Sequence, residues 1–260
     1  FMSIKVLAII QARTNSSRLP GKVLISINKK KIIQHVYDRV SSAKLIDKTY
    51  VATTILDSDL ELVKVCSKKN INIFCGSSDD VLDRYFQLAK LIKPIHVVRI
   101  TADCPVIDPL VIDHIVQIHL DGNYDYTSNT LINPFPDGQD VEIFKFSALE
   151  NAFKNTKMLS EREHVTPYIK FNEKLFNIKK VLSEKDYKKY RWTLDEKEDL
   201  EVIKFIYDKL YSKNPLFGMD DILKLYRKNK SLKKINSMHT REEGYKKSLL
   251  NDRKLNIHYE

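Results

Sequence analysis

Short, unbroken apolar runs alternate with helical segments along the first half of this chain. The run at residues 4–10 has the length of a strand, and apolar residues in the segment that follows recur at helical spacing. Unbroken apolar strands separated by helices are typical of a mostly parallel sheet with helices on both faces. The predicted fold class is therefore α/β. The same pattern predicts further strands at residues 49–54, 70–74 and 95–100, and helices at residues 32–40, 58–69, 79–92 and 109–120.

Polar residues collect where the predicted strands end. Right-handed connections place the carboxyl ends of parallel strands at one edge of the sheet, where ligands bind in folds of this class. We therefore expect one cleft at that edge. The segments that would form it are residues 11–22, 53–59, 75–80 and 99–105.

The segment QARTNSSRLPGK, residues 11–22, contains three cationic side chains, Arg13, Arg18 and Lys22. Arginine and lysine complement phosphate oxygens, so the segment favours a polyphosphate ligand, with a solvated basic turn as the alternative. The patterns GxxxxGK[ST] and GxGxxG are both missing, which excludes the two common phosphate loops. The tripeptide LPG predicts a turn with its glycine at positive φ. That turn would bring Lys22 to the same ligand as Arg13.

Two aspartates are candidates for a metal site. Asp103 ends the fourth predicted strand within TADCP, and Asp195 stands just before an amphipathic helix predicted at residues 198–211. If both reach the cleft, they form a site suited to Mg²⁺, which prefers oxygen ligands and binds one or two carboxylates together with substrate phosphates. The alternative for Asp195 is a purely structural role as the amino-terminal cap of its helix.

Composition limits the classes of protein to which this chain can belong. A chain of 260 residues with 43% hydrophobic content can bury the core of one large domain, with or without an appendage. No run approaches the roughly 20 apolar residues of a membrane-spanning helix, so no membrane span is expected. The three cysteines lack the close pairing of a zinc site or a disulfide framework, which favours a reducing, cytoplasmic location.

The net charge of +10 is compatible with a polyanionic partner. However, acidic residues are interleaved with the basic ones along the whole chain. We therefore expect no nucleic-acid partner. The charge by itself leaves a noncatalytic polyanion-binding protein as an open alternative.

A set of longer motifs carries a family resemblance. In chain order they are AIIQARTNSSRLPGKVL, VATT, GSSDDVLDRY, RITADCPVIDP, YTSNT, PDGQDVEIF, SEREHVTPYI, RWTLDEKEDLE and EEGYKKSL. Together they resemble the SpsF-type cytidylyltransferase-related proteins, a branch of the CMP-sugar synthetase (acylneuraminate cytidylyltransferase) superfamily. The resemblance implies a Rossmann-like nucleotide-diphospho-sugar transferase fold, which is GT-A-like, with a mixed, mostly parallel central sheet.

The same resemblance implies an activity. It is the Mg²⁺-dependent transfer of CMP from CTP to a sugar acid or a sugar phosphate, with release of pyrophosphate, in the biosynthesis of surface polysaccharides or glycans. A glycosyltransferase with a nucleotide-sugar donor is the catalytic alternative, because the same fold and aspartates would serve it.

The resemblance also implies roles for individual residues. Arg13, Arg18 and Lys22 match the triphosphate-binding signature, and Asp103 and Asp195 match the metal-binding aspartates. The implied catalytic residues are Arg13, Lys22, Asp103 and Asp195. The residues implied to bind the nucleotide are Ala12, Arg13, Arg18, Lys22, Thr53, Gly76, Ser77 and Asp103.

The middle of the chain is expected to bind the acceptor. The sequence SEREHVTPY predicts a helix with Ser160 and Glu163 as a capping box. The histidine of this segment is a candidate general base, with a packing role as the alternative. Ion pairing in the core or across an interface is the alternative for every acceptor candidate. These candidates are Asp140, Glu142, Arg162 and His164.

The predicted organisation is one nucleotidyltransferase domain at residues 2–212 and a helical extension at residues 213–260 that packs on it. The acceptor and dimerisation subregion is placed at residues 124–172. A homodimer is expected, because the aromatic and apolar residues of segment 144–153 offer a helix face that a lone domain would leave exposed.

Overall fold

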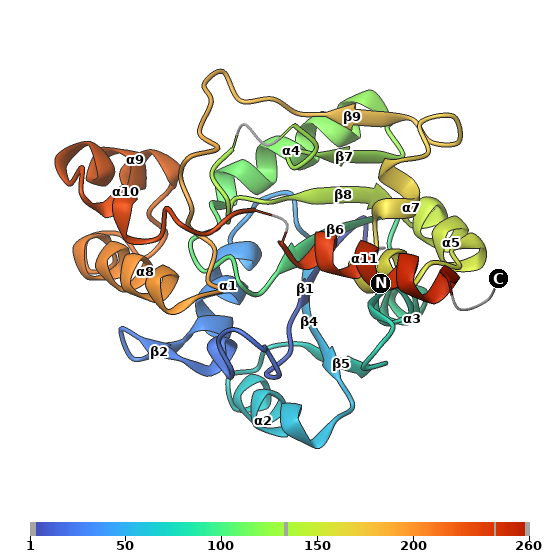
Figure 1. Ribbon diagram of the computed structural model, residues 1–260, viewed down its shortest axis with the longest axis horizontal. Helices are drawn as coiled ribbons and strands as arrows, with labels where there is room; N and C mark the ends of the chain where they lie inside the picture. The colour runs from blue at the N-terminus through green and yellow to red at the C-terminus, as the bar shows by residue number, and fades with distance from the viewer. Residues whose placement is uncertain (1–3, 133–134, 242, 258–260) are drawn as a thin grey trace.

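A seven-stranded mixed sheet forms the centre of the molecule (Figure 1). The computed structural model describes residues 4–132, 135–241 and 243–257, so the outermost residues of the predicted domain division lie outside the described part. The strand order is β5-β4-β1-β6-β8-β7-β9. The strands are β1 (Val6–Gln11), β4 (Lys48–Thr54), β5 (Ile73–Gly76), β6 (His96–Thr101), β7 (Tyr126–Ser128), β8 (Glu142–Lys145) and β9 (Ile178–Lys180).

The four strands predicted in the first half of the chain, β1, β4, β5 and β6, run parallel to one another. The strand β8 is antiparallel to both of its neighbours, β6 and β7, and β9 is parallel to β7. The predicted α/β class with a mixed, mostly parallel sheet is therefore confirmed. A separate small hairpin consists of β2 (Ser26–Ile27) and β3 (Lys30–Lys31).

Helices cover both faces of the sheet, because alternate residues of its central strand point to opposite sides. Ala8 and Ile10 of β1 belong to one core cluster, and Leu7 and Ile9 belong to the other. The first cluster is covered by α1 (Ile32–Ser41), α2 (Leu60–Lys68), α4 (Pro109–Gly122) and α8 (Lys197–Leu210). The second is covered by α3 (Val81–Ile92), α5 (Phe146–Asn155) and α7 (Pro167–Lys170).

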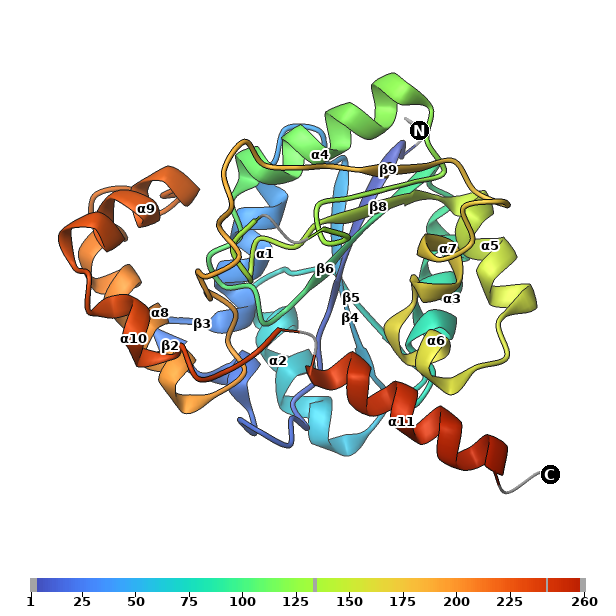
Figure 2. The same ribbon diagram turned by 45° about the horizontal axis from the view of Figure 1, so that its top comes forward.

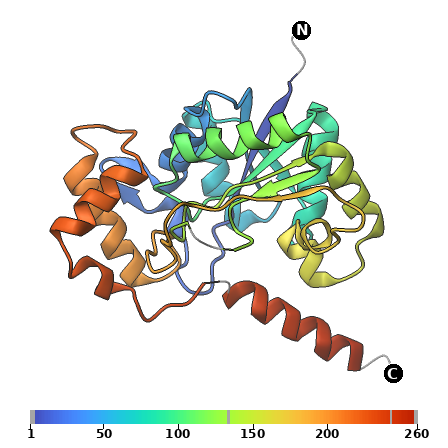
Figure 3. The ribbon, with the colours of Figure 1, turned by 90° about the horizontal axis from the view of Figure 1, so that it is seen from above.

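The carboxyl-terminal segment falls into two parts. Phe217, Ile222 and Tyr226 belong to the same core cluster as Ile10, so the region of α9 (Met219–Lys228) and α10 (Leu232–Ile235) continues the main core. The last helix lies instead along the outside of the molecule, against the short helix α6 (Figures 2 and 3). It is α11 (Glu243–Ile257), and α6 is Leu159–His164.

The capping box predicted for α6 is wrong. The helix begins after Met158, which makes no side-chain cap, and Ser160 is already its second residue. The backbone amide of Ser160 donates to the carboxylate of Asp252 on α11, at 3.2 and 3.3 Å. A side chain from a distant helix therefore takes the place of the local cap, and Glu163 accepts a hydrogen bond from Ser248 at 2.7 Å instead.

The apolar face predicted at residues 144–153 is largely covered within the chain. Phe144 lies in β8 and is fully buried, and Leu149 of α5 packs into the second core cluster. What stays open beside α5 is a groove of about 630 Å³ lined by Phe86, Phe146 and Phe153 among others. The expectation of an uncovered helix face is thus corrected to that of a groove between α3 and α5.

No helix in the described part of the chain is long and apolar enough to cross a membrane. Cys66 and Cys104 are buried free thiols, and Cys75 is an exposed one.

Candidate active site

Two adjoining cavities lie at the edge where β1 and β6 end. The larger, of about 630 Å³, is lined by the loop after β1 and by residues of α11, and we call it the basic cleft. The smaller, of about 230 Å³, is lined by paired acidic and basic side chains, and we call it the ion-pair pocket. Residues that line both cavities mark their junction, and they include Arg18, Asp103, His164 and Asp195.

A buried aspartate holds the loop after β1 in place. Thr14 donates its amide and its hydroxyl to Oδ1 of Asp59, at 2.7 and 2.6 Å. Thr53 and Thr54 of β4 donate their hydroxyls to Oδ2, at 2.8 and 2.6 Å. Burial raises the pKa of Asp59, but the hydrogen bonds from Thr14 and Thr54 outweigh burial and lower it overall. Thr53, predicted to bind the nucleotide, is fully buried and belongs to this clamp.

The turn in this loop has the predicted shape. Gly21 has φ +69°, in the left-handed region that favours glycine, and its amide donates to the carbonyl of Thr14 at 2.9 Å. The chain then enters the 3₁₀ helix η1 (Lys22–Leu24). The turn leaves Ala12, Arg13 and Lys22 lining the same basic cleft.

Lys22 joins the two aspartates that the sequence analysis selected. Its ammonium nitrogen lies 3.2 Å from Oδ2 of Asp103 and 2.8 Å from Oδ1 of Asp195. Burial lowers the pKa of Lys22, but the two carboxylates outweigh burial and raise it. Burial likewise raises the pKa of Asp103, while Lys22 and the Thr101 hydroxyl lower it below its usual range. Lys22 and Asp103 are therefore both charged at neutral pH.

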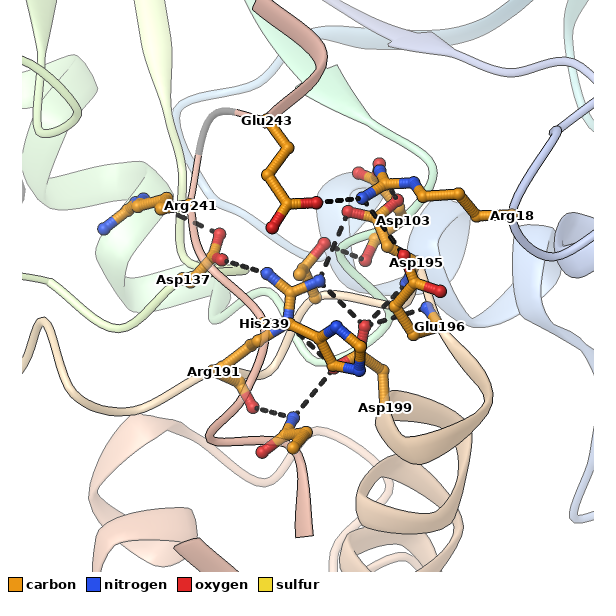
Figure 4. Close-up of polar contacts among 12 residues, drawn as sticks. Arg18, Asp103, Asp137, Arg191, Asp195, Glu196, Asp199, His239, Arg241 and Glu243 are labelled. Atoms are coloured by element: carbon orange, nitrogen blue, oxygen red, sulfur yellow. Dashed lines mark hydrogen bonds and ion pairs between the residues drawn. The ribbon is translucent and has the colours of Figure 1, made fainter. Parts of the chain in front are cut away.

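Arg18 extends this cluster toward α11. Its guanidinium lies 3.0 Å from Asp195, 3.3 Å from Glu196 and 3.5 Å from Glu243 (Figure 4). Glu243 is the first residue of α11, so this contact ties the loop after β1 to the last helix. A phosphate entering the basic cleft would compete with these carboxylates for the guanidinium.

Arg191 is the centre of a second cluster (Figure 4). It donates to Asp199 through Nε and Nη2, both at 2.9 Å, and to Asp137 through Nη1 at 2.9 Å. Its guanidinium also lies 3.5 Å from Asp195. The bidentate contact with a fully buried carboxylate fixes the plane of the guanidinium, which in turn positions the wall of the ion-pair pocket.

Asp195 is not the cap of its helix. The cap is Glu196, which forms a capping box with Asp199, and Oδ2 of Asp199 accepts the amides of Asp195 at 3.0 Å and Glu196 at 2.9 Å. The side chain of Asp195 is thereby left to contact Lys22 and Arg18. The structural alternative weighed for this residue is excluded by this geometry.

A glycine turn brings Asp137 to Arg191. Gly138 has φ +99°, and a Cβ on it would lie 2.6 Å from the carbonyl carbon of Trp192. Only glycine permits this close approach, which allows the amide of Trp192 to donate to the carbonyl of Asp137. Burial, together with the neighbouring Asp140, raises the pKa of the Asp137 carboxyl to about 7.

Three of the four acceptor candidates line the ion-pair pocket, namely Asp140, Glu142 and His164. Asp140 pairs with Arg241, and Glu142 pairs with Arg99. The fourth candidate, Arg162, is bound to Asp80 at 2.5 Å and does not line either cavity. Its role in the structure is to join α6 to the start of α3.

His164 stands at the junction of both cavities as a neutral imidazole. Its Nε2 lies 3.0 Å from the hydroxyl of Ser248 on α11. Burial, followed by the charge of Arg99, lowers the pKa of this histidine to about 4. A neutral imidazole can accept a proton, so the geometry is compatible with a general base.

The other predicted nucleotide contacts are further from the cavities. Ser77 follows β5, and its carbonyl accepts two hydrogen bonds from Arg84, at 3.0 and 2.6 Å. A Cβ on Gly76 would lie 3.0 Å from Cγ of Arg84, so the glycine lets that side chain pass. Neither Gly76 nor Ser77 lines the basic cleft, whereas Arg84 does.

Several pocket residues were missed from the sequence. Their contacts are made between distant elements, so local spacing gives no signal for most of them. The exception is Arg191, which precedes Asp195 and Asp199 by four and eight positions in RWTLDEKEDLE, a spacing that allows ion pairing. The missed residues are Arg99, Lys170, Arg191, Arg241 and Tyr245.

Asp103 and Asp195 are the residues that suit a divalent metal. Within the described residues, no cluster of three or more metal-ligating side chains is present. The two carboxylates nevertheless direct one oxygen each at a single cation, the ammonium of Lys22. Two hard oxygen donors beside a cleft lined with basic side chains match the way Mg²⁺ binds together with phosphates.

Known proteins resemble this chain over most of its length. The family model described as cytidylyltransferase matches residues 7–235. The spore coat polysaccharide biosynthesis protein SpsF of Bacillus subtilis is 30% identical over 86% of this chain and 95% of its own length. An uncharacterised protein of Methanocaldococcus jannaschii is 37% identical over 94% of this chain and 98% of its own length.

A solved structure of a cytidylyltransferase from Leptospira borgpetersenii is also similar to this chain. It superposes with a TM-score of 0.83 at 32% identity, over 88% of this chain and 96% of that one. The structure of CMP:2-keto-3-deoxy-manno-octonic acid synthetase in complex with CTP shares the fold, with a TM-score of 0.60 at 17% identity, over 79% and 99% of the two chains. The chain therefore belongs to the cytidylyltransferase family and is of the SpsF type.

Proposed function

We propose that this protein transfers CMP from CTP to a sugar acid or a sugar phosphate and releases pyrophosphate. The observation that carries the proposal is the cluster of Lys22, Asp103 and Asp195 at the junction of two cavities. A transfer reaction needs two substrates to meet at one reacting centre. The basic cleft suits the triphosphate, and the ion-pair pocket suits a polar acceptor.

The cationic side chains of the basic cleft would bind the phosphates of the nucleotide. Arg13, Arg18 and Lys22 would stabilise the negative charge that develops on the phosphate oxygens and on the leaving pyrophosphate. The α-phosphate would lie near the junction, where Asp103 and Asp195 are placed.

The acceptor would react from the ion-pair pocket. An oxygen of the acceptor attacks the α-phosphorus of CTP, a new P–O bond forms, and the bond to pyrophosphate breaks. The proton released by the acceptor hydroxyl would pass to the neutral imidazole of His164, which lines both cavities. No covalent intermediate with the protein is required.

Asp103 and Asp195 are the proposed ligands of Mg²⁺. When bound there, the ion would supply positive charge that polarises the phosphate oxygens. The residues of the chain that accompany it are Lys22 and Arg18, which already contact these carboxylates.

The biological setting proposed is the biosynthesis of a surface polysaccharide or another glycan. It is supported by the similarity over most of the chain to a spore coat polysaccharide biosynthesis protein. Other relatives are 3-deoxy-manno-octulosonate cytidylyltransferases, for instance that of Solibacter usitatus, which is 36% identical over 43% of this chain.

A pyrophosphate-release assay tests the proposal. The protein is incubated with Mg²⁺ and with CTP, GTP or UTP, against a panel of sugar acids and sugar phosphates. Release of pyrophosphate that requires both CTP and one acceptor is the expected result. Release of a nucleoside diphosphate from a nucleotide sugar, with no turnover of any triphosphate, would identify a glycosyltransferase and contradict the proposal.

A further inference from the structure

Lys170 differs from the other cations of the ion-pair pocket. Four arginines line this pocket, and each of them pairs with a carboxylate of the protein. Lys170 also lines it, at the end of α7, and it forms no ion pair with any carboxylate of the described residues. Among the described residues, Lys170 is thus the lysine of this pocket that has no carboxylate within ion-pair distance.

Aromatic rings hold this ammonium at the wall of the pocket. The nitrogen of Lys170 lies 5.2 Å from the ring centroid of Phe171 and 5.4 Å from that of Tyr245. The ring of Tyr245 also meets His164 edge-on, with centroids 5.0 Å apart. Cation–π contacts orient an ammonium without neutralising its charge. Lys170 is therefore positioned but still able to bind an anion.

Glu142, an acidic side chain that lines the same pocket, already has other partners. Glu142 pairs with Arg99 and accepts hydrogen bonds from Tyr126 at 2.5 Å and Thr166 at 2.7 Å. Burial raises the pKa of Glu142, but Arg99 and then Lys170 outweigh it and lower that pKa to about 2. The charge of Lys170 therefore reaches Glu142 only at longer range, and a ligand in the pocket can approach the ammonium directly.

We propose that Lys170 binds the anionic group of the acceptor and thereby selects acidic sugars over neutral ones. This inference rests on the proposed function and deepens it, since it names a residue that recognises the acceptor. The group recognised is a carboxylate or a phosphate, because either can pair with a lysine ammonium. Thr130 lines the same pocket, and its hydroxyl can contact the sugar or its anionic group, whereas the hydroxyl of Thr166 is donated to Glu142.

Calorimetric titration of the full chain with matched ligand pairs tests this role. The probes are 3-deoxy-manno-octulosonate against its methyl ester, and mannose 1-phosphate against mannose, each titrated into the protein without nucleotide or Mg²⁺, so that the proposed reaction contributes no heat. We expect the wild-type protein to bind at least one anionic member more tightly than its neutral counterpart. Lys170→Gln should weaken that binding by about 10- to 100-fold, because one charge-assisted contact is lost, and should leave the neutral member unchanged.

Two further variants sharpen the comparison. Lys170→Arg keeps the charge and should retain most of the preference for the anion. Lys209→Gln is the matched control, because Lys209 also lies over an aromatic ring, that of Phe205 at 5.6 Å, but lines neither cavity. In the pyrophosphate assay, Lys170→Gln should raise the KM for the acceptor while the KM for CTP stays unchanged.

The two proposals fail in different ways. Equal affinity of the wild type for anionic and neutral members, or an unchanged preference in Lys170→Gln, overturns the role of Lys170. If Lys170→Gln abolishes the preference while no pyrophosphate is released with any triphosphate, the anion site stands and the proposed transfer reaction falls.

Discussion

Lys22 connects parts of the chain that are far apart in sequence. Its ammonium holds Asp103, which follows β6, at 3.2 Å and Asp195, which precedes α8, at 2.8 Å. Two carboxylates this close would repel one another without a cation between them. The residue therefore has a structural effect in the free protein as well as its proposed contact with the triphosphate.

The first prediction concerns this basic cleft. Lys22→Ala and Arg13→Ala should each lower turnover by about 10²- to 10³-fold, because each removes a preorganised contact to the phosphates. The measurement is pyrophosphate release together with calorimetric titration of CTP. Lys44→Ala, at an exposed lysine, is the control and should behave like wild type. Unchanged CTP affinity and turnover in both variants would refute the phosphate assignment.

The second prediction concerns the metal. Asp103→Asn should lower Mg²⁺-dependent turnover by about 10²-fold or more, because an amide is a much weaker ligand than a carboxylate and also leaves Lys22 with one partner fewer. Pyrophosphate release across a Mg²⁺ titration measures the effect, and Asp57→Asn at an exposed position serves as the control. Full Mg²⁺-dependent activity in Asp103→Asn would show that Asp103 takes no part in catalysis, although it lies near Asp195.

The third prediction concerns pH and a buried histidine pair. Nδ1 of His96 lies 3.1 Å from Nε2 of His119, and His119 also contacts the hydroxyl of Thr127. Burial lowers the pKa of His96 to about 4 and that of His119 to about 3. The folded state therefore binds fewer protons than the unfolded state between pH 6.5 and pH 4, so the free energy of unfolding should fall as the pH falls through this range.

The expected loss between pH 7 and pH 5 is about 2 kcal/mol per histidine. Urea denaturation at both pH values measures it. His119→Gln should lose less stability over this interval than wild type, and His114→Gln, at an exposed position of α4, should lose the same amount as wild type. Equal slopes in all three proteins would contradict the assignment.

The residues that sequence reasoning found are those whose position follows from strand order. Asp103 lies two residues after the parallel strand β6, so its place at the sheet edge could be derived from the apolar pattern alone. Lys170 could not be found this way, because what singles it out is the pairing of every arginine around it. Thr53 ends a strand too, but its hydroxyl turns to the buried Asp59, which the pattern does not reveal.

At the scale of elements, a set of polar contacts attaches α11 to the rest of the molecule. Asp252 accepts the amide of Ser160, Ser248 contacts Glu163 and His164, and Arg18 pairs with the first residue of the helix. A hydrogen bond or an ion pair is lost when one of its two partners is replaced, and the helix that it holds then opens more often.

The fourth prediction follows for this helix. Asp252→Asn should speed hydrogen exchange of the amides of α11 by about tenfold, because a hydrogen bond to a charged acceptor contributes about 1.5 kcal/mol. Exchange in α4 should stay unchanged, since that helix packs into the main core. Asp220→Asn, at an exposed position in α9, is the control. Unaltered exchange in α11 would mean that other contacts hold it.

The elements best predicted from sequence are those with a strong apolar period. The helices α1, α3 and α4 lie close to their expected ranges because their buried faces repeat at helical spacing. The start of α6 was mispredicted, because its amide partner comes from Asp252, far away in the chain. A capping pattern within one short segment of the sequence cannot indicate a partner that comes from a distant helix.

At the scale of the whole molecule, the fifth prediction concerns assembly. We expect a homodimer, with the groove beside α5 as the contact surface, because Phe86, Phe146 and Phe153 line it. Light scattering at micromolar concentration should give about twice the chain mass of 30.4 kDa. A mass equal to that of one chain would contradict this expectation.

The overall architecture was predictable because parallel strands with helical connections admit few arrangements. The antiparallel insertion of β8 between β6 and β7 was not derivable from the apolar pattern, and it entered only through the family resemblance, which implied a mixed sheet. This insertion brings Glu142, at the start of β8, directly opposite Arg99 of β6, and both residues line the pocket.

The two cavities are lined by segments from Gln11 through to Asn251. During synthesis the sheet strands leave the ribosome well before α11, and folding proceeds from the amino-terminal part of a chain. A nascent chain that has reached β9 can therefore pair all seven strands while Glu243, Tyr245 and Ser248 are still missing. The wall that α11 contributes to both cavities thus forms later than the sheet, and a ribosome-bound chain that has been released as far as α8 would hold Asp103 and Asp195 in a site without that wall.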